Sequence, residues 1–487
     1  MKGRFFTIVL WSAVMMLSLS CQKEVSQEQV LERFQTSLVE IELTRKLHNY
    51  RLPWVTGQKI VLKNGLVLTG NRILTTADDV SGALLVRVQK DGEAKRYDAS
   101  LEWVDYYANL AVLNVADDAF WKGLEPVQLA STIPQSGELN ILRWRNGRLE
   151  ARAAEIERLF VGKSQTSYVE YPQLEVTSEI GAAGWAEVVV QQGRVVGLTA
   201  SANGKSLRIL PSELILKVLE ARKKSPHGAL AYMDFVWQPG TNPDLLRSLG
   251  LDSTDQGIII NITDVKRIAP QVLLPGDVIT DIAGFPIDVE GKYRDPDYGR
   301  LPFQALATRN VMAGDTLKMT VWREQKKISV DYVLPAAVFS NDLVPDAEYD
   351  LAPEYLIAGG FVYQSVIGPY LAAHGANAPF LLKYYDYRRP VTDRNSLVVI
   401  SGVLPDPYNR GYEDHGQLIV DRINDRPIST VQDVAEALKN PLDGFHVVRF
   451  FPDQLVRTLI MDSTSMDLST ARVLERYRIP EDRYFRN

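Results

Sequence analysis

Residues 174–198 read LEVTSEIGAAGWAEVVVQQGRVVGL and carry the strongest structural pattern of the chain. An apolar strand over residues 174–177 leads into the small-residue turn Gly-Ala-Ala-Gly at 181–184, and a second strand follows. A tight Gln-Gly turn at 192–193 then leads into a third strand at 194–198. Runs of β-branched residues separated by glycine turns are typical of antiparallel strands joined by hairpins. The segment therefore predicts a β-rich domain with a glycine-bounded loop between two strands.

Length and composition limit what the chain can be. A chain of 487 residues is expected to hold about three domains, at roughly 100–200 residues each. With 46% hydrophobic and 23% charged residues, the composition is that of an ordinary globular protein. The net charge is −6 and no lysine/arginine stripe is present, so nucleic-acid binding has no electrostatic basis. No His/Cys/Asp cluster has metal-ligand spacing, and we expect neither a metal nor a cofactor.

The N-terminus has the features of a targeting segment. Lys2 and Arg4 precede a short apolar run over residues 5–19, which is too short to span a bilayer comfortably and matches a signal-peptide core. Cys21, the only cysteine, follows this run directly and resembles the lipidated cysteine of bacterial lipoproteins. We expect residues 1–21 to be a lipoprotein-type signal, 22–36 a polar tether, and the protein a membrane-anchored lipoprotein on the periplasmic side of the bacterial cell envelope. The alternative is an ordinary secretory signal. A single cysteine allows no disulfide within the chain.

Residues 37–222 are dominated by short strands. The apolar segments 61–68, 83–89, 101–104 and 110–115 recur at roughly 8–12-residue spacing, which is typical of an all-β sandwich or barrel rather than of alternating βαβ units. The domain is predicted to close with a helix opening at Ser212, which is suited to cap it. Residues 223–228 read as a boundary.

Two further units follow this domain. Residues 229–335 mix strands and helices around the turn-and-strand pattern QVLLPGDVI at 271–279, with a hairpin at Ala283-Gly284. Residues 336–395 show no clean periodicity and are interpreted as an irregular connector. Residues 396–465 repeat the earlier pattern, with strands at 397–403 and 417–423 and a helix opening at Ser429/Thr430. Residues 466–487 are predicted to form a helical tail.

This order of units resembles the HtrA/Deg family, most closely the branch also found in plant organelles. The resemblance is carried by five short runs in the expected order, namely Ile73–Ala77 (ILTTA), Asn109–Leu113 (NLAVL), Phe120–Leu124 (FWKGL), Asn242–Leu245 (NPDL) and Arg478–Pro480 (RIP). It implies a mostly β fold: a chymotrypsin-like double β-barrel followed by two PDZ-like α+β domains. It also implies serine endopeptidase ancestry and assembly as a homotrimer.

The catalytic positions implied by the family are all substituted. Where the family has histidine after Ile-Leu-Thr-Asn-Ala, this chain has Asp78, and where it has the orienting aspartate, this chain has Asn109. The serine position is Ala183, in a vestigial oxyanion turn that includes Gly181 and is followed by bulky Trp185. Loss of a triad costs about 10⁶-fold in kcat. The sequence therefore favours a pseudoprotease, with a serine-type endopeptidase using a non-standard active site, or a purely architectural envelope protein, as the alternatives.

Other side chains that could replace the triad carry weaker signals. The five histidines, His48, His227, His374, His415 and His446, all fall outside the barrel motifs. Asp78 with Asp79 could act as a carboxylate pair, but we favour a solvated turn at the start of a helix, where acids suit the helix dipole. Ser178 lies five residues before the serine position with no base beside it in sequence. The segment Arg143–Gly147 corresponds to a loop on the substrate side.

The PDZ-like units predict protein binding. PDZ domains bind an extended segment as an added strand and hold a terminal carboxylate with backbone N–H groups of a Φ-Gly-Φ loop. In the first unit this loop corresponds to Met233-Asp234-Phe235, with aspartate at the glycine position. We therefore expect a preference for internal segments over free C-termini; a purely structural role for this unit is the alternative. The loop of the second unit cannot be assigned from the sequence. The expected partners are peptides or unfolded envelope proteins, bound by a scaffold, a chaperone-like holder or a regulator.

Overall fold

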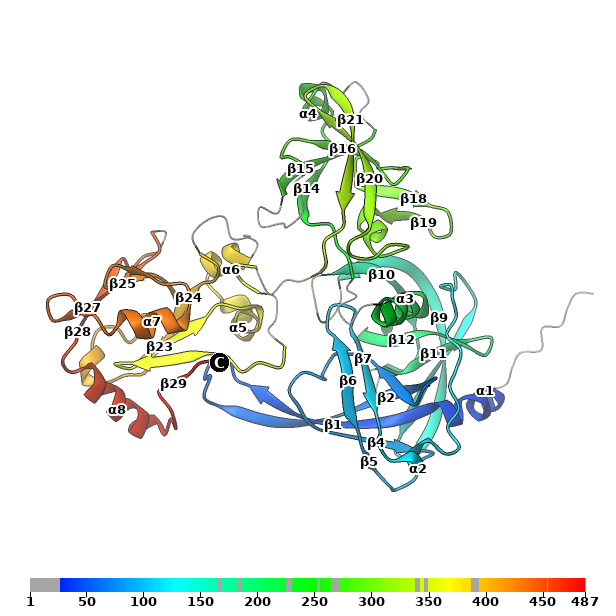
Figure 1. Cartoon of the computed structure of the whole chain (residues 1–487), viewed down its shortest axis with the longest axis horizontal. Coiled ribbons are helices and arrows are strands. Elements are labelled where there is room, and N and C mark those ends of the chain that lie inside the picture. The colour runs from blue at the N-terminus through cyan, green and yellow to red at the C-terminus, as the bar shows by residue number, and fades with distance from the viewer. Residues whose placement is uncertain are drawn as a thin grey trace, which may run out of the picture.

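A computed structural model describes residues 27–163, 166, 169–181, 186–224, 230–251, 255–263, 272–337, 342–345, 349–386, 394–452 and 454–486. Figure 1 shows three bodies: β1 to β13 with α3 on the right, β14 to β21 at the top, and β22 to β29 on the left. Strands greatly outnumber helices in every body. The predicted mostly β fold class is confirmed.

The first half of the N-terminal body is a seven-stranded sheet in the order β5-β4-β1-β2-β3-β7-β6. It comprises β1 (Leu38–His48), β2 (Thr56–Leu68), β3 (Arg72–Thr75), β4 (Ala83–Lys90), β5 (Tyr97–Asp98), β6 (Ser100–Asp105) and β7 (Leu110–Asn114), preceded by α1 (Gln27–Phe34) and followed by α2 (Asp118–Trp121). Alternate residues of the strands point inward, so that Ile41, Val67 and Ile73 share one apolar core.

The second half is a closed barrel in the order β10-β13-β12-β11-β8-β9. Its elements are β8 (Glu138–Arg145), β9 (Arg148–Lys163), β10 (Glu170–Thr177), β11 (Val188–Gln191), β12 (Arg194–Asn203), β13 (Ser206–Pro211) and the closing helix α3 (Ser212–Lys224). The predicted Gln192-Gly193 turn joins β11 to β12 with φ of +49° and +75°. Positive φ at both central residues is what a type I′ hairpin requires.

The second body has a six-stranded sheet in the order β14-β15-β16-β20-β21, with β17 paired to β16 off this path. It contains β14 (Phe235–Pro239), α4 (Pro243–Ser248), β15 (Ile258–Thr263), β16 (Val278–Ile282), β17 (Phe285–Pro286), β18 (Lys292–Asp295), β19 (Gly299–Pro302), the 3₁₀ turn η2 (Phe303–Ala307), β20 (Thr316–Arg323) and β21 (Lys326–Val333). The predicted hairpin at Ala283-Gly284 joins β16 to β17. We call this body PDZ1.

The third body repeats that arrangement with added strands at one edge. Its sheet order is β28-β27-β25-β24-β23-β22-β29. Its elements are β22 (Tyr355–Ala358), β23 (Phe361–Ser365), α5 (Gly368–His374), α6 (Phe380–Asp386), β24 (Val398–Val403), β25 (Leu418–Ile423), β26 (Arg426–Pro427), α7 (Val431–Ala437), β27 (Phe445–Phe450), β28 (Thr458–Asp462), α8 (Met466–Tyr477) and β29 (Arg483–Tyr484). Thr430 caps α7 through a capping box with Asp433. We call this body PDZ2.

The prediction that residues 336–395 form an irregular connector is wrong. Residues 355–365 form the hairpin β22–β23 toward one edge of the PDZ2 sheet, and two α-helices follow before residue 387. The tail is also part of the module, because β29 pairs with β22 and Val473 of α8 is fully buried. All four side chains of β22 are buried. A strand buried on both faces has no period-two alternation, which is why the sequence pattern missed it.

A long β-ribbon links the N-terminal body to PDZ2. The tip between β1 and β2 reaches the third body, as Figure 1 shows for the two blue strands. There the ring of Trp54 meets Tyr355 edge-on at 6.0 Å, and Arg51 Nε donates to the carbonyl of Ala373 at 2.9 Å.

Candidate functional site

Two of the three degenerate triad positions lie together in the first barrel. Asn109 opens β7 from a left-handed conformation (φ +54°), which asparagine tolerates better than most residues, and its side chain is fully buried. Its Oδ1 accepts a hydrogen bond from the backbone N–H of Asp78 at 2.9 Å. The third position, Ala183, lies outside the described residues together with Ala182, Gly184 and Trp185.

A buried lysine completes this cluster. Lys63 lies on β2 with its side chain fully buried, and its Nζ donates to Thr76 Oγ1 at 2.9 Å and to the carbonyl of Asp78 at 2.5 Å. The same Nζ lies 3.1 Å from Asp78 Oδ2 in an ion pair. Burial lowers the pKa of the Lys63 ammonium below its ordinary range, while the Asp78 carboxylate acts in the opposite direction.

Sequence reasoning missed Lys63, although the chain carries a signal for it. Val61, Lys63, Gly65 and Val67 occupy alternate positions of one strand, and all four are buried. A lysine whose side chain points from an apolar strand into the core needs a buried partner, since burying an unpaired charge is very costly. Asp78 is that partner.

The prediction that Asp78 and Asp79 start a helix in a solvated turn is wrong. Residues 78–82 form a turn that leads directly into β4, with φ of +62° at Asp79, so no helix follows. Asp78 faces Lys63 with its side chain 14% exposed, and Asp79 pairs with Arg45. Both carboxylates therefore balance nearby cations.

Among the described residues, no acyl-transfer triad is assembled around Asp78 and Asn109. A triad needs an imidazole beside a hydroxyl and a carboxylate that holds the imidazole. The histidines of the described part, His48, His374, His415 and His446, make no hydrogen bond to Asp78 or Asn109, and His227 lies outside the described residues. The Thr76 hydroxyl lies beside Lys63, but both side chains are fully buried.

Ser178 is a structural residue. Its hydroxyl donates to the carbonyl of Ala153 at 3.0 Å, and only 2% of the residue is exposed. Gly181, at the edge of the vestigial oxyanion turn, approaches Gly204 closely: a Cβ there would lie 3.2 Å from the Gly204 carbonyl.

The segment that corresponds to a substrate-side loop is a tight β-hairpin. Asn146 and Gly147 form its turn with φ of +53° and +72°, and Arg145 pairs with Arg148 across it. Below the turn, Arg143 and Arg152 both pair with the fully buried Glu187. The position is therefore occupied by a hairpin whose arginines are held in an internal ion-pair network.

The segment between PDZ1 and PDZ2 docks beside the degenerate positions. The ring of Tyr349 stacks on Tyr106 with centroids 3.8 Å apart, and Tyr106 Oη donates to Asp350 Oδ2 at 2.7 Å. Asp350 Oδ1 accepts from the backbone N–H of Gly82 at 2.9 Å, and its own N–H donates to Ser81 Oγ at 2.8 Å. We call Tyr349 and Asp350 the linker latch. It contacts the turn after Asp78 at Ser81 and Gly82.

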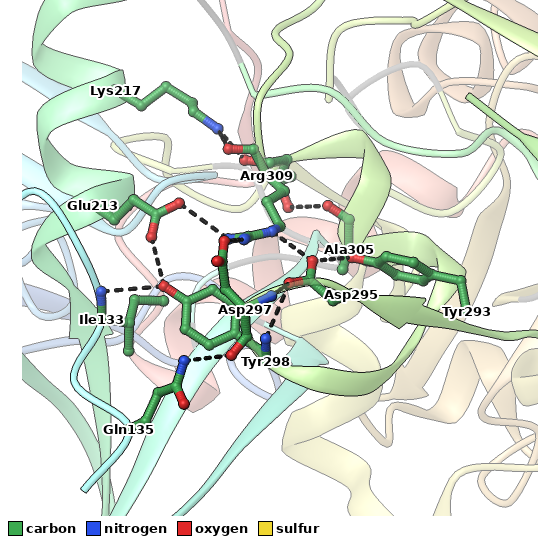
Figure 2. A network of polar contacts seen from close by, with 11 residues as sticks. Ile133, Gln135, Glu213, Lys217, Tyr293, Asp295, Asp297, Tyr298, Ala305 and Arg309 are labelled. Atoms are coloured by element: carbon green, nitrogen blue, oxygen red, sulfur yellow. Dashed lines mark hydrogen bonds and ion pairs between the residues drawn. The ribbon is translucent and has the colours of Figure 1, made fainter. Parts of the chain in front are cut away.

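A polar network fixes PDZ1 on the barrels, as Figure 2 shows. Arg309 of PDZ1 has a side chain only 10% exposed, and its Nε lies 2.6 Å from Asp295 Oδ2. It also pairs with Glu213 of α3 at 3.4 Å, and its guanidinium stacks 4.4 Å from the ring centroid of Tyr298. Tyr298 Oη donates to Glu213 at 3.1 Å and accepts from the N–H of Ile133 at 3.2 Å. Four charged or aromatic groups thus join the two bodies.

The predicted PDZ1 loop leads into the edge strand. Phe235 starts β14, Met233 packs against the PDZ1 core, and Asp234 is 4% exposed. The backbone N–H of Asp234 donates to Tyr332 Oη at 3.0 Å, and that hydroxyl donates to the Asp234 carboxylate. The amide that a Φ-Gly-Φ loop would offer to a terminal carboxylate is therefore already bonded within the domain.

The corresponding loop of PDZ2 can now be placed. Gly359-Gly360 precedes Phe361-Val362-Tyr363-Gln364, as Met233-Asp234 precedes Phe235-Val236-Trp237-Gln238. The two runs form β23 and β14, each paired on one side in the same way with the next long strand. This internal repeat was the sequence signal that could have identified the second loop.

Other site classes have little support in the described part of the chain. Among those residues, no group of three or more His, Cys, Asp and Glu side chains could hold a metal ion. None of the helices found there is both long enough and apolar enough to cross a bilayer. Cys21, the predicted lipidation site, lies outside the described residues.

Comparison with known proteins extends these observations. Residues 344–484 match the family described as PDZ domain, which is the PDZ2 body with its added strands and α8. The chain is 23% identical over 473 residues to the mitochondrial Do-like 3 protein of Arabidopsis thaliana, covering 94% of this chain and 82% of that one. It is 22% identical over 468 residues to the chloroplastic Protease Do-like 2 of the same plant, covering 92% and 75%.

Among solved structures, the HtrA-type protease AlgWS227A with a decapeptide has a TM-score of 0.50 at 18% identity, covering 64% of this chain and 98% of that one. This likeness shows the fold. The chain thus resembles Deg/HtrA-like proteases over nearly all of its length, and its fold with the matched PDZ domain fits the trypsin-like plus PDZ architecture of such proteins.

Proposed function

We propose that this chain is a pseudoprotease that binds extended protein segments without cleaving them. One observation carries the proposal: the position of the catalytic histidine holds Asp78, whose carboxylate is ion-paired to the buried Lys63. A carboxylate that neutralises a buried ammonium is a poor general base, because taking up a proton would leave that charge without its partner. Asn109 adds an amide where a triad needs a carboxylate.

The linker latch supports the same proposal. It adds a second obstacle, because a peptide entering along the Asp78 turn would have to displace Asp350 from Gly82 and Tyr106. Alanine at position 183 removes the hydroxyl that would attack.

Binding is assigned to the edge of β14. Among the described residues no strand pairs with the outer side of β14, and Val236 at its centre is 42% exposed. An open strand edge can accept a segment by main-chain hydrogen bonding. Because the Asp234 amide is occupied by Tyr332, we propose that internal segments bind as well as free C-termini or better.

A fluorophosphonate probe tests the absence of catalysis. The probe reacts with activated serines, so we expect no labelling of the purified chain under conditions in which trypsin is labelled fully. Labelling that disappears on substitution of one particular serine would instead establish the serine endopeptidase with a non-standard active site.

A pair of peptides tests the mode of binding. The same apolar sequence is titrated with a free and with an amidated C-terminus, and fluorescence anisotropy gives both Kd values. We expect the amidated form to bind at least as tightly. Clearly tighter binding of the free acid would show that a terminal carboxylate is recognised. An edge variant, Val236→Pro, serves as the control and is expected to weaken both peptides, because proline removes a backbone donor and is poorly accommodated in strands.

We also propose that the protein is anchored in the bacterial cell envelope through a lipid on Cys21, and that it assembles as a homotrimer like other members of its family. The sequence around Cys21 supports the anchor. Metabolic labelling with an alkynyl fatty acid tests it: wild type is expected to be labelled and Cys21→Ser unlabelled. Light scattering of the detergent-extracted protein tests the trimer.

A further inference from the structure

The two PDZ bodies share one strand plan and differ at one edge. In PDZ1 the order is β14-β15-β16-β20-β21, with the short β17 paired to β16. In PDZ2 the strands β23-β24-β25-β27-β28 follow the same antiparallel order, with the short β26 paired to β25. β23 therefore takes the place of β14. In PDZ1 that strand ends the described sheet, whereas in PDZ2 it does not.

The outer edge of β23 is covered by β22. The two strands pair antiparallel over the whole of β22, from Tyr355 opposite Gln364 to Ala358 opposite Phe361. This is the position and direction in which a PDZ domain takes up a ligand strand. The connecting residues Gly359 and Gly360 have φ of +58° and +87°, so the usual ligand-binding loop has become a two-residue hairpin turn.

The side chains of β22 fill the place of ligand side chains. Leu356 and Ala358 are 3% and 5% exposed and belong to the same core as Val431 and Val434 of α7. Tyr355 and Ile357 point to the other face, where they pack with Val473 and Ile479 and against Trp54 of the β1–β2 ribbon. Alternate residues thus enter the space between strand and helix, as those of a bound peptide do.

We propose that residues 355–358 are a built-in ligand of PDZ2, so that this module is closed to other chains and only PDZ1 offers an open edge. The assignment of capture to PDZ1 rests on the proposed binding function; the closure of PDZ2 does not. A ligand tethered by two residues has a very high effective concentration, against which a free peptide cannot compete. The outer edge of β22 is itself partly covered, because β29 pairs with Tyr355 and Leu356.

Hydrogen exchange of the intact, unliganded chain tests the closure directly. An edge strand leaves alternate amides without a partner, whereas an interior strand protects all of them. Along β23 we expect continuous protection over residues 362–365. Along β14 we expect alternation, with the outward amides exchanging at least about tenfold faster than their neighbours. Alternating, fast exchange along β23 would overturn the proposal.

A variant tests whether β22 behaves as a ligand. Leu356→Lys places a charge between β23 and α7, while Leu351→Lys makes the same change at a residue that is 46% exposed and outside the strand. The probe is a labelled peptide with the sequence of residues 352–358, acetylated and amidated. We expect saturable binding to Leu356→Lys at least about tenfold tighter than to wild type or Leu351→Lys, with new protection confined to β23.

Two results separate this inference from the proposed function. If no peptide binds β14 but β23 is protected in the unliganded chain, the capture proposal fails and the closure of PDZ2 stands. If Leu356→Lys keeps protection in β27 and β28 and still fails to bind the probe, β22 is not a replaceable ligand and the inference is overturned. If that variant loses protection in β27 and β28 as well, the exchange pattern of the wild type decides.

Discussion

At the scale of single residues, the decisive feature is the contact between Asp78 and Asn109, the positions that the HtrA/Deg resemblance assigns to a catalytic pair. Asn109 binds the backbone of Asp78, and we propose that this contact is structural and not catalytic. Lys63 then binds Asp78 from β2. The sequence predicted the loss of the triad from Asp78, Asn109 and Ala183, but it could not predict Lys63 as the partner, because that pairing joins β2 to the turn after β3.

Lys63→Met tests the energetic role of this pair. The substitution fills similar space but leaves the Asp78 carboxylate without its cation, and we expect a loss of about 2–3 kcal/mol in the free energy of unfolding. The double variant Lys63→Met/Asp78→Asn removes both charges and is expected to recover part of that loss. Urea unfolding measures all three proteins. A double variant no more stable than Lys63→Met would show that the ion pair is not what holds the turn.

Asp406 provides a pH-dependent test in PDZ2. Arg472 first, together with the Tyr408 N–H and the Ser469 hydroxyl, lowers the pKa of Asp406 from 3.8 to about 2. Because the folded-state pKa is depressed, the carboxylate stabilises the fold above pH 4, and this contribution is lost as the pH falls from about 4 to about 2. Because Arg472 is half-exposed and therefore partly screened by solvent, we expect the Asp406 carboxylate to contribute about 1–2 kcal/mol to the free energy of unfolding. Thermal unfolding of Asp406→Asn should show a shallower pH dependence than wild type in that window; parallel curves would contradict this.

At the scale of elements, segments with a local cause in the sequence were predictable. The apolar runs of β2, β4 and β7 and the cap at Thr430 gave correct elements for that reason. β22 failed that test because all its side chains are buried, and the turn after Asp78 failed because Arg45 and Lys63 hold it in place of a helix. The linker latch was equally out of reach, since Tyr106 and Asp350 are far apart in the chain.

Asp350→Ala tests the latch. It removes the acceptor of both the Tyr106 hydroxyl and the Gly82 N–H, and we expect a loss of about 1 kcal/mol together with faster hydrogen exchange over residues 80–82. Asp331→Ala, at an exposed position on β21, is the matched control and should change neither quantity. Unchanged exchange at residues 80–82 in Asp350→Ala would mean that the latch does not hold the cleft.

At the scale of the whole molecule, PDZ1 and PDZ2 are each fixed to the barrels by different means. PDZ1 is held by the Arg309 network, PDZ2 by the β1–β2 ribbon through Trp54 and Arg51. In this arrangement β14 ends the described PDZ1 sheet, whereas β22 lies between β23 and β29. None of these contacts could be inferred from one sequence, because each depends on the relative placement of separate domains.

Arg309→Met tests the rigidity of PDZ1. The substitution leaves Asp295 and Glu213 without their cation at the interface, so PDZ1 should detach from α3 in part of the population and the radius of gyration measured by X-ray scattering should rise. Arg300→Met is the control, because Arg300 pairs only within PDZ1 at a side chain that is 56% exposed. Identical scattering from Arg309→Met and wild type would show that other contacts fix the domain.

The central claim is that this chain binds protein segments and leaves them whole. The most direct measurement is to incubate the purified protein with an unfolded, mass-defined polypeptide, recover the complex, and weigh the bound chain by intact-mass spectrometry. The account predicts that the polypeptide is recovered with the protein at its full mass, and that Val236→Pro lowers the amount recovered. Fragments that form in the presence of wild-type protein, and that vanish when one of its serines is replaced, would contradict it.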